Sequence, residues 1–503
     1  MIGFRVGAGS PRPRPAWGAV TAPLFAVAAV YAQEIPPDIP DFSRAGYRAG
    51  EADPPRRRPD LLVTGFGAKA DDEGDDTAAF RAALAEAGKR PDGAVVGIPA
   101  GRWILRDVLR IDRDGVVLQG AGPGRTVLFF PRPLSDLQNG AIGNDVRGTF
   151  LSAAGGGSGA PVARLTRAAK AGERTLAVRF DKGAKPPERD EWLEIVWYND
   201  TGRDTLLDHL HGGVVPRDRL GKELREDKGP RVRDWVRVAG SGPDRIDLAD
   251  PLPLDARPEW GVVLVRRRPL REVGMEGFTI GFPETEYPGH LKEKGYHGIS
   301  FSGVVDGWIR DVETVNADIA VSVGSSRRVT VSDTAIRGRM MHHGFVVGRS
   351  SDCLFTRWRI EAPHVHGITV TWNAFGNVYS KGWGRDLAMD AHRAASFRNL
   401  HTDITIECGP KVLDPLRSGG SSPRGPHAGR DTIYWNIRFE FPDVKKPVRL
   451  GPYGEWPLAV FAGWRGNRPI ELEPAPGMKQ RVLWLNEEPP VGDLYEWQRN
   501  HRR

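Results

Sequence analysis

The chain has 503 residues, with 71 lysines and arginines against 64 acidic residues and a formal net charge of +7. Its 61 glycines and 41 prolines follow no period, which excludes a collagen-like fibre or a flexible linker and favours a turn-rich folded protein. The basic excess forms no block, and no basic–aromatic module or helix-turn-helix pattern accompanies it, so we expect no nucleic-acid partner. The excess indicates either a solvated surface or attraction for an anionic polymer.

The first 32 residues have the pattern of an export signal. Three arginines precede the apolar stretch AVTAPLFAVAAVYA, and Val30-Tyr31-Ala32 is a small-residue cleavage site. Pro23 interrupts the apolar run, which is also short for a membrane span, so a membrane anchor is only the alternative. Because the leader contains no acidic residue, we predict cleavage near Ala32 to give a secreted or periplasmic protein of net charge +4, without stable membrane insertion.

The cysteine content limits how the fold is stabilised. Cys353 and Cys408 are the two cysteines of the sequence, which excludes a disulfide framework and a cysteine-based zinc site. The two could pair in an oxidising compartment, or both could stay buried as free thiols. The sequence leaves these alternatives open.

Residues 33–58 are expected to form an irregular N-terminal arm, and residues 59–136 an N-terminal cap with the first coils. A short strand leads into an acidic turn, where Asp75-Asp76-Thr77 is expected to cap a helix. The apolar positions of this helix keep helical spacing; they are Ala79, Phe80, Ala83, Leu84 and Ala87. The stretches AVVGIPAGRWILRDVLRI and GVVLQGAGPGRTVLFF then predict short strands broken by glycine.

Three stretches of this region resemble the opening of the rhamnogalacturonase/epimerase-like domain of the pectate lyase superfamily: FGAKADDEGDDTAAFRAAL, VVGIPAGRWIL and VVLQGAGPGRTVL. The resemblance is specific over residues 61–130 and looser over 270–440. It implies an all-β, pectin-lyase-like fold, a right-handed parallel β-helix with an N-terminal capping helix. The chain departs from the family at Asp71-Asp72-Glu73, where a glycine is usual. Because this segment normally caps the fold, the resemblance indicates the fold more than the chemistry.

Residues 137–265 interrupt the coil pattern. The stretches RTLAVRF, EWLEIVWYND, DWVRVAG and DRIDLADPLPL alternate apolar and polar residues between glycine and proline turns, and they are longer than a coil needs. We expect a β-rich insertion or long loops here, with elongated coils as the alternative. The main coils are expected over residues 266–441 and a C-terminal capping tail over 442–503.

A coil-length repeat begins near residue 271. The motif histidine–glycine–apolar recurs at intervals of 46 and then 23 residues, two coils and one coil, in His297-Gly298-Ile299, His343-Gly344-Phe345 and His366-Gly367-Ile368. The missing copy falls near residues 318–320, and one further period lands on Asp390. A second register predicts stacking of Trp308-Ile309, Arg328-Val329, Cys353-Leu354, Asn377-Val378 and Asn399-Leu400.

Stacked parallel coils place equivalent residues about 4.8 Å apart, so the repeat predicts a polar ladder on one face. Its catalytic candidates are His343, His366, Asp390, His392 and Arg393. The substrate-binding candidates come from the same coils and from a glycine-serine loop; they are His364, Asp318, Arg385, Trp383, Arg424 and His427. A purely structural ladder is the alternative.

Imidazoles beside a carboxylate are suited to proton transfer near neutral pH. We therefore predict a polysaccharide lyase that cleaves a uronate-containing polysaccharide by β-elimination. Arg393 and Arg385 would neutralise the substrate carboxylate, while His366 or His343 would transfer protons.

Glycoside hydrolysis is the runner-up, because it needs two carboxyl groups about 5–9.5 Å apart. Asp318 and Asp390 would lie about 14 Å apart on the ladder. A closer partner could come from Asp386, Glu361, Glu407 or Asp414. An epimerase on the same fold, or a non-catalytic polysaccharide binder such as an adhesin, are further alternatives. An adhesin would have long uniform coils, whereas this chain concentrates histidine, arginine and tryptophan in its last third.

No metal is assigned, because the chain has no short metal motif. His343, His366 and His392 with Asp390 nevertheless have donors suited to zinc. Ca²⁺ held by Asp390 and neighbouring acids is another alternative, although the dense aspartate cluster expected for calcium is missing. The expected partner is an acidic polysaccharide; the sequence names neither its sugar nor an oligomeric state.

Overall fold

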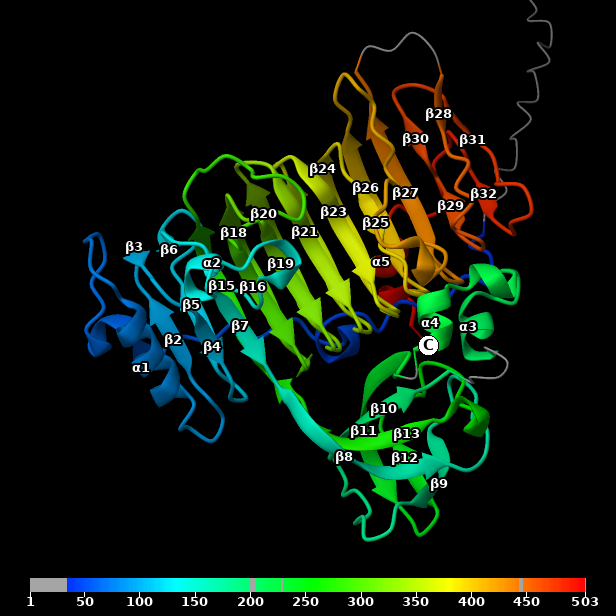
Figure 1. The fold of residues 1–503 in the computed structure, drawn as a ribbon, viewed down its shortest axis with the longest axis horizontal. Coiled ribbons are helices and arrows are strands. Elements are labelled where there is room, and N and C mark those ends of the chain that lie inside the picture. The colour runs from blue at the N-terminus through cyan, green and yellow to red at the C-terminus, as the bar shows by residue number, and fades with distance from the viewer. Residues whose placement is uncertain (1–33, 200–204, 228, 443–446, 503) are drawn as a thin grey trace, which may run out of the picture.

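The computed structural model describes residues 34–199, 205–227, 229–442 and 447–502. The predicted export signal, with its cleavage site near Ala32, lies outside these residues. In the described part, no helix is both long and apolar enough to cross a membrane. Most of the described chain winds into a right-handed parallel β-helix, drawn from blue to red along the long axis of Figure 1.

Two long sheets run along the β-helix. Among the described residues the larger has 15 strands, and its path is β1 (Leu61–Leu62), β2 (Val95–Ile98), β5 (Val117–Gly120), β15 (Gly274–Gly281), β18 (Trp308–Val315), β20 (Thr330–Arg337), β22 (Leu354–Ile360), β24 (Val378–Arg385), β26 (Leu400–Glu407), β27 (Ile433–Glu440), β29 (Val460–Ala462) and β32 (Arg481–Leu483). Beside this path lie β3 (Gly101–Ile104), β6 (Thr126–Phe129) and β30 (Arg465–Gly466).

The second sheet has seven strands in the described chain: β4 (Leu109–Ile111), β7 (Leu151–Ala154), β16 (His297–Ser302), β19 (Ile319–Gly324), β21 (Met341–Gly348), β23 (His364–Thr371) and β25 (Met389–Ala391). Two short pairs complete the coils, β14 (Leu270–Arg271) with β17 (Val304–Val305) and β28 (Val448–Leu450) with β31 (Ile470–Leu472). Neighbouring strands in both sheets are parallel. The predicted right-handed parallel β-helix is confirmed.

Stacked side chains fill the inside of the coils. Five aromatic rings, one from each of five successive strands of the larger sheet, lie above one another in register with centroids 4.5–5.7 Å apart; they are Phe355, Tyr379, His401, Tyr434 and Phe461. A single short strand could not bury such a ring, whereas stacked coils bury the whole column.

The second predicted register is right over the last three coils and out of step before them. Leu354, Val378 and Leu400 are paired as predicted. However, Leu354 pairs with Thr330, and Thr330 pairs with Trp308. Arg328-Val329 was therefore placed one residue too early relative to Cys353-Leu354 and two residues too early relative to Trp308-Ile309.

Helix α1 (Thr77–Ala87) covers the N-terminal end of the coils, at the left of Figure 1. Its apolar side packs into the main core through residues that the helical spacing predicted, including Phe80, Ala83 and Leu84. Asp76 stands at the N-cap position without a capping bond from its side chain, and Asp75 instead accepts a hydrogen bond from the Thr77 N–H. A short helix, α2 (Leu134–Leu137), follows the first coils.

Within residues 137–265 and shortly after, the chain leaves the coils and closes an antiparallel barrel, below the β-helix in Figure 1. Its strands are β8 (Gly156–Leu165), β9 (Thr175–Phe180), β10 (Trp192–Trp197), β11 (Val232–Ser241), β12 (Arg245–Leu248) and β13 (Val263–Arg268). Between β10 and β11 lie two short helices, α3 (Thr205–Leu210) and α4 (Lys222–Glu226). The strands predicted from alternation are thus joined into one closed sheet with its own apolar core.

The barrel is attached to the coils by buried charges and aromatic packing. The guanidinium of Arg327 lies between Asp234 of the barrel and Asp352 of the β-helix, at 3.4 and 3.1 Å, and all three side chains are buried. Phe375 and Phe397, stacked at a coil turn, join the barrel's apolar core. This attachment places α4 beside the loop that follows β26.

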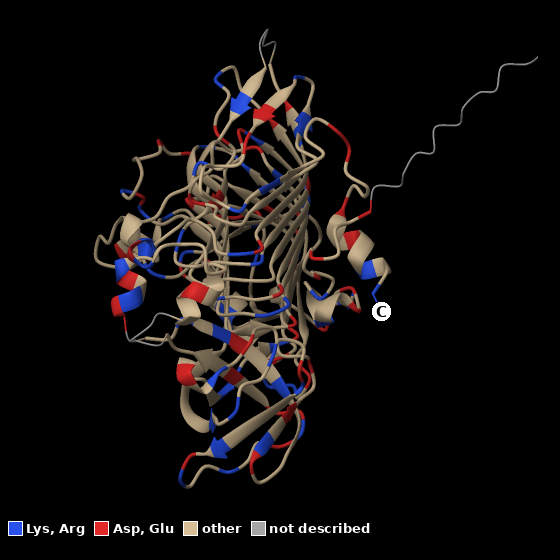
Figure 2. Ribbon diagram, turned by 90° about the vertical axis from the view of Figure 1, so that its right-hand side faces the viewer, with Lys and Arg blue, Asp and Glu red and all other residues tan. Residues whose placement is uncertain are grey.

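The C-terminal segment returns along the larger sheet. Helix α5 (Leu494–Asn500) lies against the outer face of this sheet beside the N-terminal arm, as the edge-on view of Figure 2 shows. Leu494 N–H donates to Thr402 and the Tyr495 hydroxyl donates to the carbonyl of Ala45. Figure 2 also shows that basic and acidic residues alternate over the described molecule without a single-sign block.

Cys353 and Cys408 are both free and buried, so the pairing alternative is wrong.

Candidate active site

His343 and His366 lie on neighbouring strands β21 and β23, in register with each other. Their rings stack with centroids 4.7 Å apart. The register continues to Ile319, which occupies the coil where the histidine motif is missing, and then to His297. The predicted histidine spacing is therefore confirmed for these four coils.

The glycine after each histidine has a steric reason. A Cβ on Gly344 would stand 2.4 Å from the carbonyl oxygen of Gly367 in the next coil. A Cβ on Gly367 would in turn lie 2.7 Å from the Leu387 side chain. The repeat His-Gly-apolar thus marks the corner where successive coils approach closely.

Asp390 joins the site by a different route from the predicted one. It pairs with Thr369 on β23, three residues after His366, so its predicted place in line with the histidines is wrong. The coil from Thr369 to Asp390 is 21 residues long, shorter than the period that predicted the ladder. The side chain nevertheless reaches the histidines: its Oδ2 lies 2.8 Å from Nδ1 of His392 and 3.1 Å from Nδ1 of His366.

The Asp390 carboxylate organises a network of imidazoles. It accepts hydrogen bonds from His392 Nδ1, from the Thr369 hydroxyl at 3.1 Å and from the Gly419 N–H at 3.0 Å. Thr369 also contacts Nδ1 of His343 at 2.9 Å. Asp390 itself is fully buried, whereas 23% of the His392 side chain is exposed. The buried carboxylate can therefore contact a substrate only through the imidazole rings that cover it.

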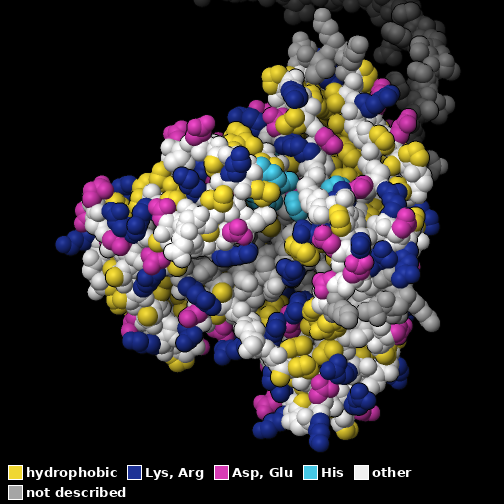
Figure 3. Space-filling view, viewed as in Figure 1, with side chains coloured by type: hydrophobic (Ala, Val, Ile, Leu, Met, Phe, Trp, Pro, Cys, Tyr) yellow, Lys and Arg dark blue, Asp and Glu magenta, His cyan; other side chains and the backbone are white. Residues whose placement is uncertain are grey.

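A second carboxylate holds further histidines that the sequence interpretation missed. His342 stacks on His343 at 4.2 Å, and its Nδ1 lies 3.2 Å from Glu293. Tyr287 donates a hydrogen bond of 2.5 Å to Glu293. The exposed ring of His290 lies 4.6 Å from that of His342. Figure 3 shows histidine side chains, in cyan, at the surface together in a hollow of the molecule; we call the hollow at this cluster, over β21, β23 and β25, the histidine hollow.

The missed residues differ in how far the sequence could have revealed them. His342 directly precedes a predicted site residue in the stretch MHHGF, and that doubled histidine was an available signal. His290 and Glu293 lie in the loop between β15 and β16, which has no period. That loop is held in place by the α2 region, where Leu134 N–H and Gly143 N–H donate to carbonyls of the loop.

Burial sets the charge of the site. It lowers the pKa of His366 to about 4, although the Asp390 charge opposes this. Burial, reinforced by the neighbouring histidines, also lowers the pKa of His343 well below its ordinary value. For the carboxyls, burial alone would raise the pKa, but hydrogen bonds outweigh it: the pKa of Glu293 falls to about 2 and that of Asp390 falls below its ordinary value. Near neutral pH these carboxylates are charged, and the two buried rings are neutral.

Five other predicted residues make their contacts outside this cluster. Arg393 pairs with Glu455 at 2.6 Å and contacts His427, whose Nδ1 is bonded to the Ala391 carbonyl. Arg424 pairs with Glu223 of α4. Arg385 pairs with Glu407 on the larger sheet, where Trp383 stacks under Arg359. The two arginines predicted to neutralise the substrate, Arg393 and Arg385, therefore both carry an acidic partner.

The two remaining candidates are fixed by structural contacts. His364 is buried, with Nδ1 on the Ala362 carbonyl and Nε2 accepting from the Ala388 N–H. Asp318 is buried against Arg339 at 2.6 Å and accepts two backbone N–H bonds. The carboxyls considered as hydrolytic partners are also engaged elsewhere, in the pairs Asp386–Gly409, Glu361–Arg359, Glu407–Arg385 and Asp414–Tyr453.

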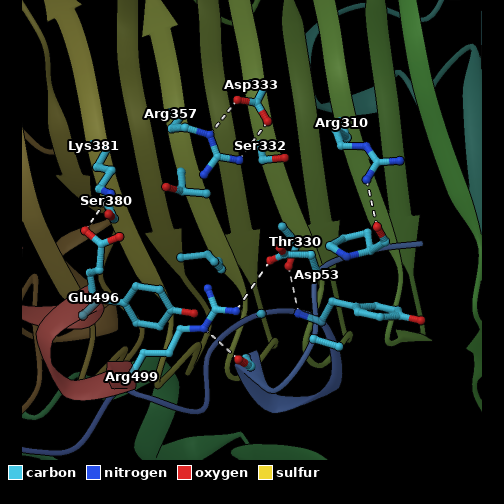
Figure 4. Close-up of a pocket in the computed structure, with 18 of the residues that line it drawn as sticks. Asp53, Arg310, Thr330, Ser332, Asp333, Arg357, Ser380, Lys381, Glu496 and Arg499 are labelled. Carbon is cyan, nitrogen blue, oxygen red and sulfur yellow. Dashed lines mark hydrogen bonds and ion pairs between the residues drawn. The ribbon is translucent and has the colours of Figure 1, made fainter. Parts of the chain in front are cut away.

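A second hollow lies on the opposite side, between the larger sheet, the N-terminal arm and α5 (Figure 4). It has a volume of about 280 Å³. Four of its basic side chains are paired with acids: Arg357 with Asp333, Lys381 with Glu496, Arg499 with Asp53 and Arg310 with Glu276. These pairs neutralise the basic side chains that line the second hollow. The histidine cluster is therefore the stronger candidate for an active site.

Comparison with known proteins supports the fold. Residues 62–140 match the family model described as rhamnogalacturonase A/epimerase, pectate lyase-like. The predicted resemblance to the pectate lyase superfamily is thereby confirmed over this segment. No curated protein matches this chain.

Solved structures similar to this chain include a phage tailspike, an exopolygalacturonase and an epimerase module. The tailspike gp49 from Pseudomonas phage LKA1 is 12% identical over 84% of this chain and 78% of its own, with a TM-score of 0.43. The family 28 exopolygalacturonase of Yersinia enterocolitica is 12% identical over 86% and 79%, at 0.37. The A-module of the Azotobacter vinelandii mannuronan C-5 epimerase AlgE6 is 10% identical over 86% and 100%, at 0.38. Because the TM-scores are below 0.5, we infer nothing about the site from these similarities.

Proposed function

We propose that the protein is an exported enzyme that cleaves a uronate-containing polysaccharide by β-elimination in the histidine hollow. One observation carries this proposal: both carboxylates of the cluster, Asp390 and Glu293, are buried beneath imidazoles. A carboxylate so covered cannot attack a sugar carbon or protonate a glycosidic oxygen directly, as hydrolysis requires. The groups of the cluster that can reach a substrate are the imidazoles, so proton transfer by an imidazole is the chemistry that we propose.

His392 is the group that we assign to the proton transfer. Its Nδ1 donates to Asp390 at 2.8 Å, which fixes the ring and leaves Nε2 as the proton acceptor. The charged carboxylate stabilises the imidazolium formed when Nε2 takes a proton, as in other carboxylate–imidazole pairs. His392 is also the most exposed ring directly bonded to this carboxylate.

The reaction balances with this one ring. Nε2 removes the proton from C5 of the uronate, and the electron pair of the C5–H bond forms the C4–C5 double bond. The C4–O4 bond breaks, O4 leaves with its electron pair, and the imidazolium returns the proton to O4. Positioned acid–base groups of this kind supply about 10²- to 10⁴-fold each. Epimerisation begins with the same proton removal but keeps the C4–O4 bond, and it is the alternative that the assay must separate.

The test is a panel of soluble uronate polymers, including galacturonan, mannuronan and glucuronan, incubated with the purified mature protein. Elimination produces an unsaturated uronate that absorbs in the ultraviolet. New reducing ends without this absorbance would indicate hydrolysis, inversion at C5 without cleavage would indicate an epimerase, and no change in any polymer would indicate a binding protein. The export proposal is tested by the N-terminus of the secreted chain, which should be Gln33.

A further inference from the structure

Beside the pair of His392 and Asp390, the imidazoles of His290, His342 and His366 form a second group with its own chemistry. One ligand atom from each of His290, His342 and His366 lies within 4.8 Å of the other two. The three rings come from the loop before β16, from β21 and from β23, so the fold rather than one local segment brings them together. We propose that this group binds a transition-metal ion of the Zn²⁺ class.

The outer nitrogen contacts support metal binding. Nδ1 of His342 lies 3.2 Å from Glu293, and Nδ1 of His366 lies 3.1 Å from Asp390. In metal sites the ligating histidine typically gives its other ring N–H to a carboxylate, which fixes the tautomer and strengthens the donor nitrogen. Here two of the three rings have a carboxylate within 3.2 Å of Nδ1, although the Nδ1 of His366 is not aligned for a hydrogen bond to Asp390. The Nε2 atoms of these two rings are then the candidate ligand atoms.

The arrangement is difficult to explain by packing alone. His342 and His366 have centroids 5.5 Å apart, and His290 lies 4.6 and 6.0 Å from them. With Nδ1 protonated, the lone pairs on Nε2 repel one another unless a cation or a donor lies between them. Three imidazole nitrogens with a fourth position for an oxygen are a donor set that suits Zn²⁺, which binds histidine nitrogen at about 2.0–2.1 Å. Because His290 is exposed and lies on a loop, its ring can rotate to close the present spacing.

Metal binding does not depend on the proposed elimination. An ion at this position would nevertheless provide a positive charge near His392, a charge that Arg393 and Arg385 do not supply because each is paired with a glutamate. Its open position would accept an oxygen of an anionic ligand.

The experiment uses the mature protein freed of metal by a chelator and then titrated with Zn²⁺ against a chromophoric competitor, without polysaccharide. We expect one ion per chain. His290→Ala and His342→Ala should each lower the affinity by at least 10-fold, and Glu293→Gln by about 10- to 100-fold. Co²⁺ bound in place of Zn²⁺ should give a visible absorption spectrum that His342→Ala abolishes.

His392→Ala is the matched control, because His392 belongs to a second possible donor group, with His366 and Asp390. Its zinc affinity should equal that of the wild type. Loss of affinity in His392→Ala with retention in His290→Ala would place the ion at Asp390 and overturn the proposal, as would failure of the folded wild type to bind Zn²⁺. Elimination by the metal-free protein would leave the proposed function intact, so the two failures are distinguishable.

Discussion

At the scale of single residues, the site depends on carboxylates that act through rings. Asp390 and Glu293 are both buried, and each is bonded to an imidazole that reaches the hollow. The sequence indicated His343, His366 and Asp390 because a period connects them. It could not indicate Glu293 or His290, since a loop without period carries them, nor that glutamates would pair with Arg393 and Arg385.

Replacing Asp390 by asparagine should lower kcat/KM by about 10²- to 10⁴-fold, because His392 loses the charge that orients it and stabilises its protonated form. Steady-state kinetics on the responsive polymer measures the effect, and a denaturant titration checks the fold. Glu407→Gln, which removes a carboxylate paired with Arg385 on the other sheet, is the control and should keep wild-type turnover. Equal activity of the two variants would exclude Asp390 from the mechanism.

At the scale of elements, close stacking of the coils accounts for what the sequence revealed and what it did not. The histidine–glycine repeat was detectable because successive coils approach closely at this corner, which favours a small residue: glycine follows His297, His343 and His366, and Ala320 has the same place after Ile319. The register of Asp390 could not be predicted from the period, because the last coil is shorter than the coils before it. The carboxylate reaches the histidines through the direction of its side chain and not through its place in the strand register.

Gly344→Ala should lower the free energy of unfolding by about 1–3 kcal/mol, since the added methyl meets a carbonyl oxygen that the next coil holds in place. Gly324→Ala is the matched control on the neighbouring strand β19, where a Cβ meets nothing within 4 Å. Urea unfolding followed by circular dichroism measures both. Similar stability for the two variants would contradict the close approach of coils.

The aromatic column predicts an acid-sensitive core. Burial lowers the pKa of His401 from 6.5 to about 3, so the folded protein keeps the ring neutral while the unfolded chain takes up a proton. The stability from this residue is therefore complete above pH 6.5 and is lost as the pH falls toward 3, by about 1.4 kcal/mol per pH unit. His401→Phe keeps the stack without a titrating group, and its unfolding free energy should fall less steeply over this range. An unchanged pH slope would refute this.

At the scale of the whole molecule, a β-helix carries a barrel whose helix α4 packs against the loop that follows β26. Alternating strands in residues 137–265 were detectable in the sequence, but their closure into a barrel depends on long-range pairings that no local pattern specifies. The same is true of the attachment, which relies on one arginine between two carboxylates of different parts of the chain.

Arg327→Leu should destabilise the protein by about 3–5 kcal/mol, because it leaves Asp234 and Asp352 buried without a counter-charge. Arg245→Leu, which removes a mostly exposed cation from the barrel pair with Asp247, should change stability by about 1 kcal/mol at most. Chemical denaturation of both variants is the measurement. Comparable small losses would show that the buried triad does not hold the barrel in place.

The most direct test of the proposed chemistry counts two products on one responsive uronate polymer, new double bonds and new reducing ends, over the same time course. Elimination predicts one double bond for each new end, and it predicts that His392→Ala loses both together while keeping the wild-type unfolding curve. New ends without double bonds, or a His392→Ala variant with wild-type rates, would contradict the assignment of the histidine hollow as a lyase site.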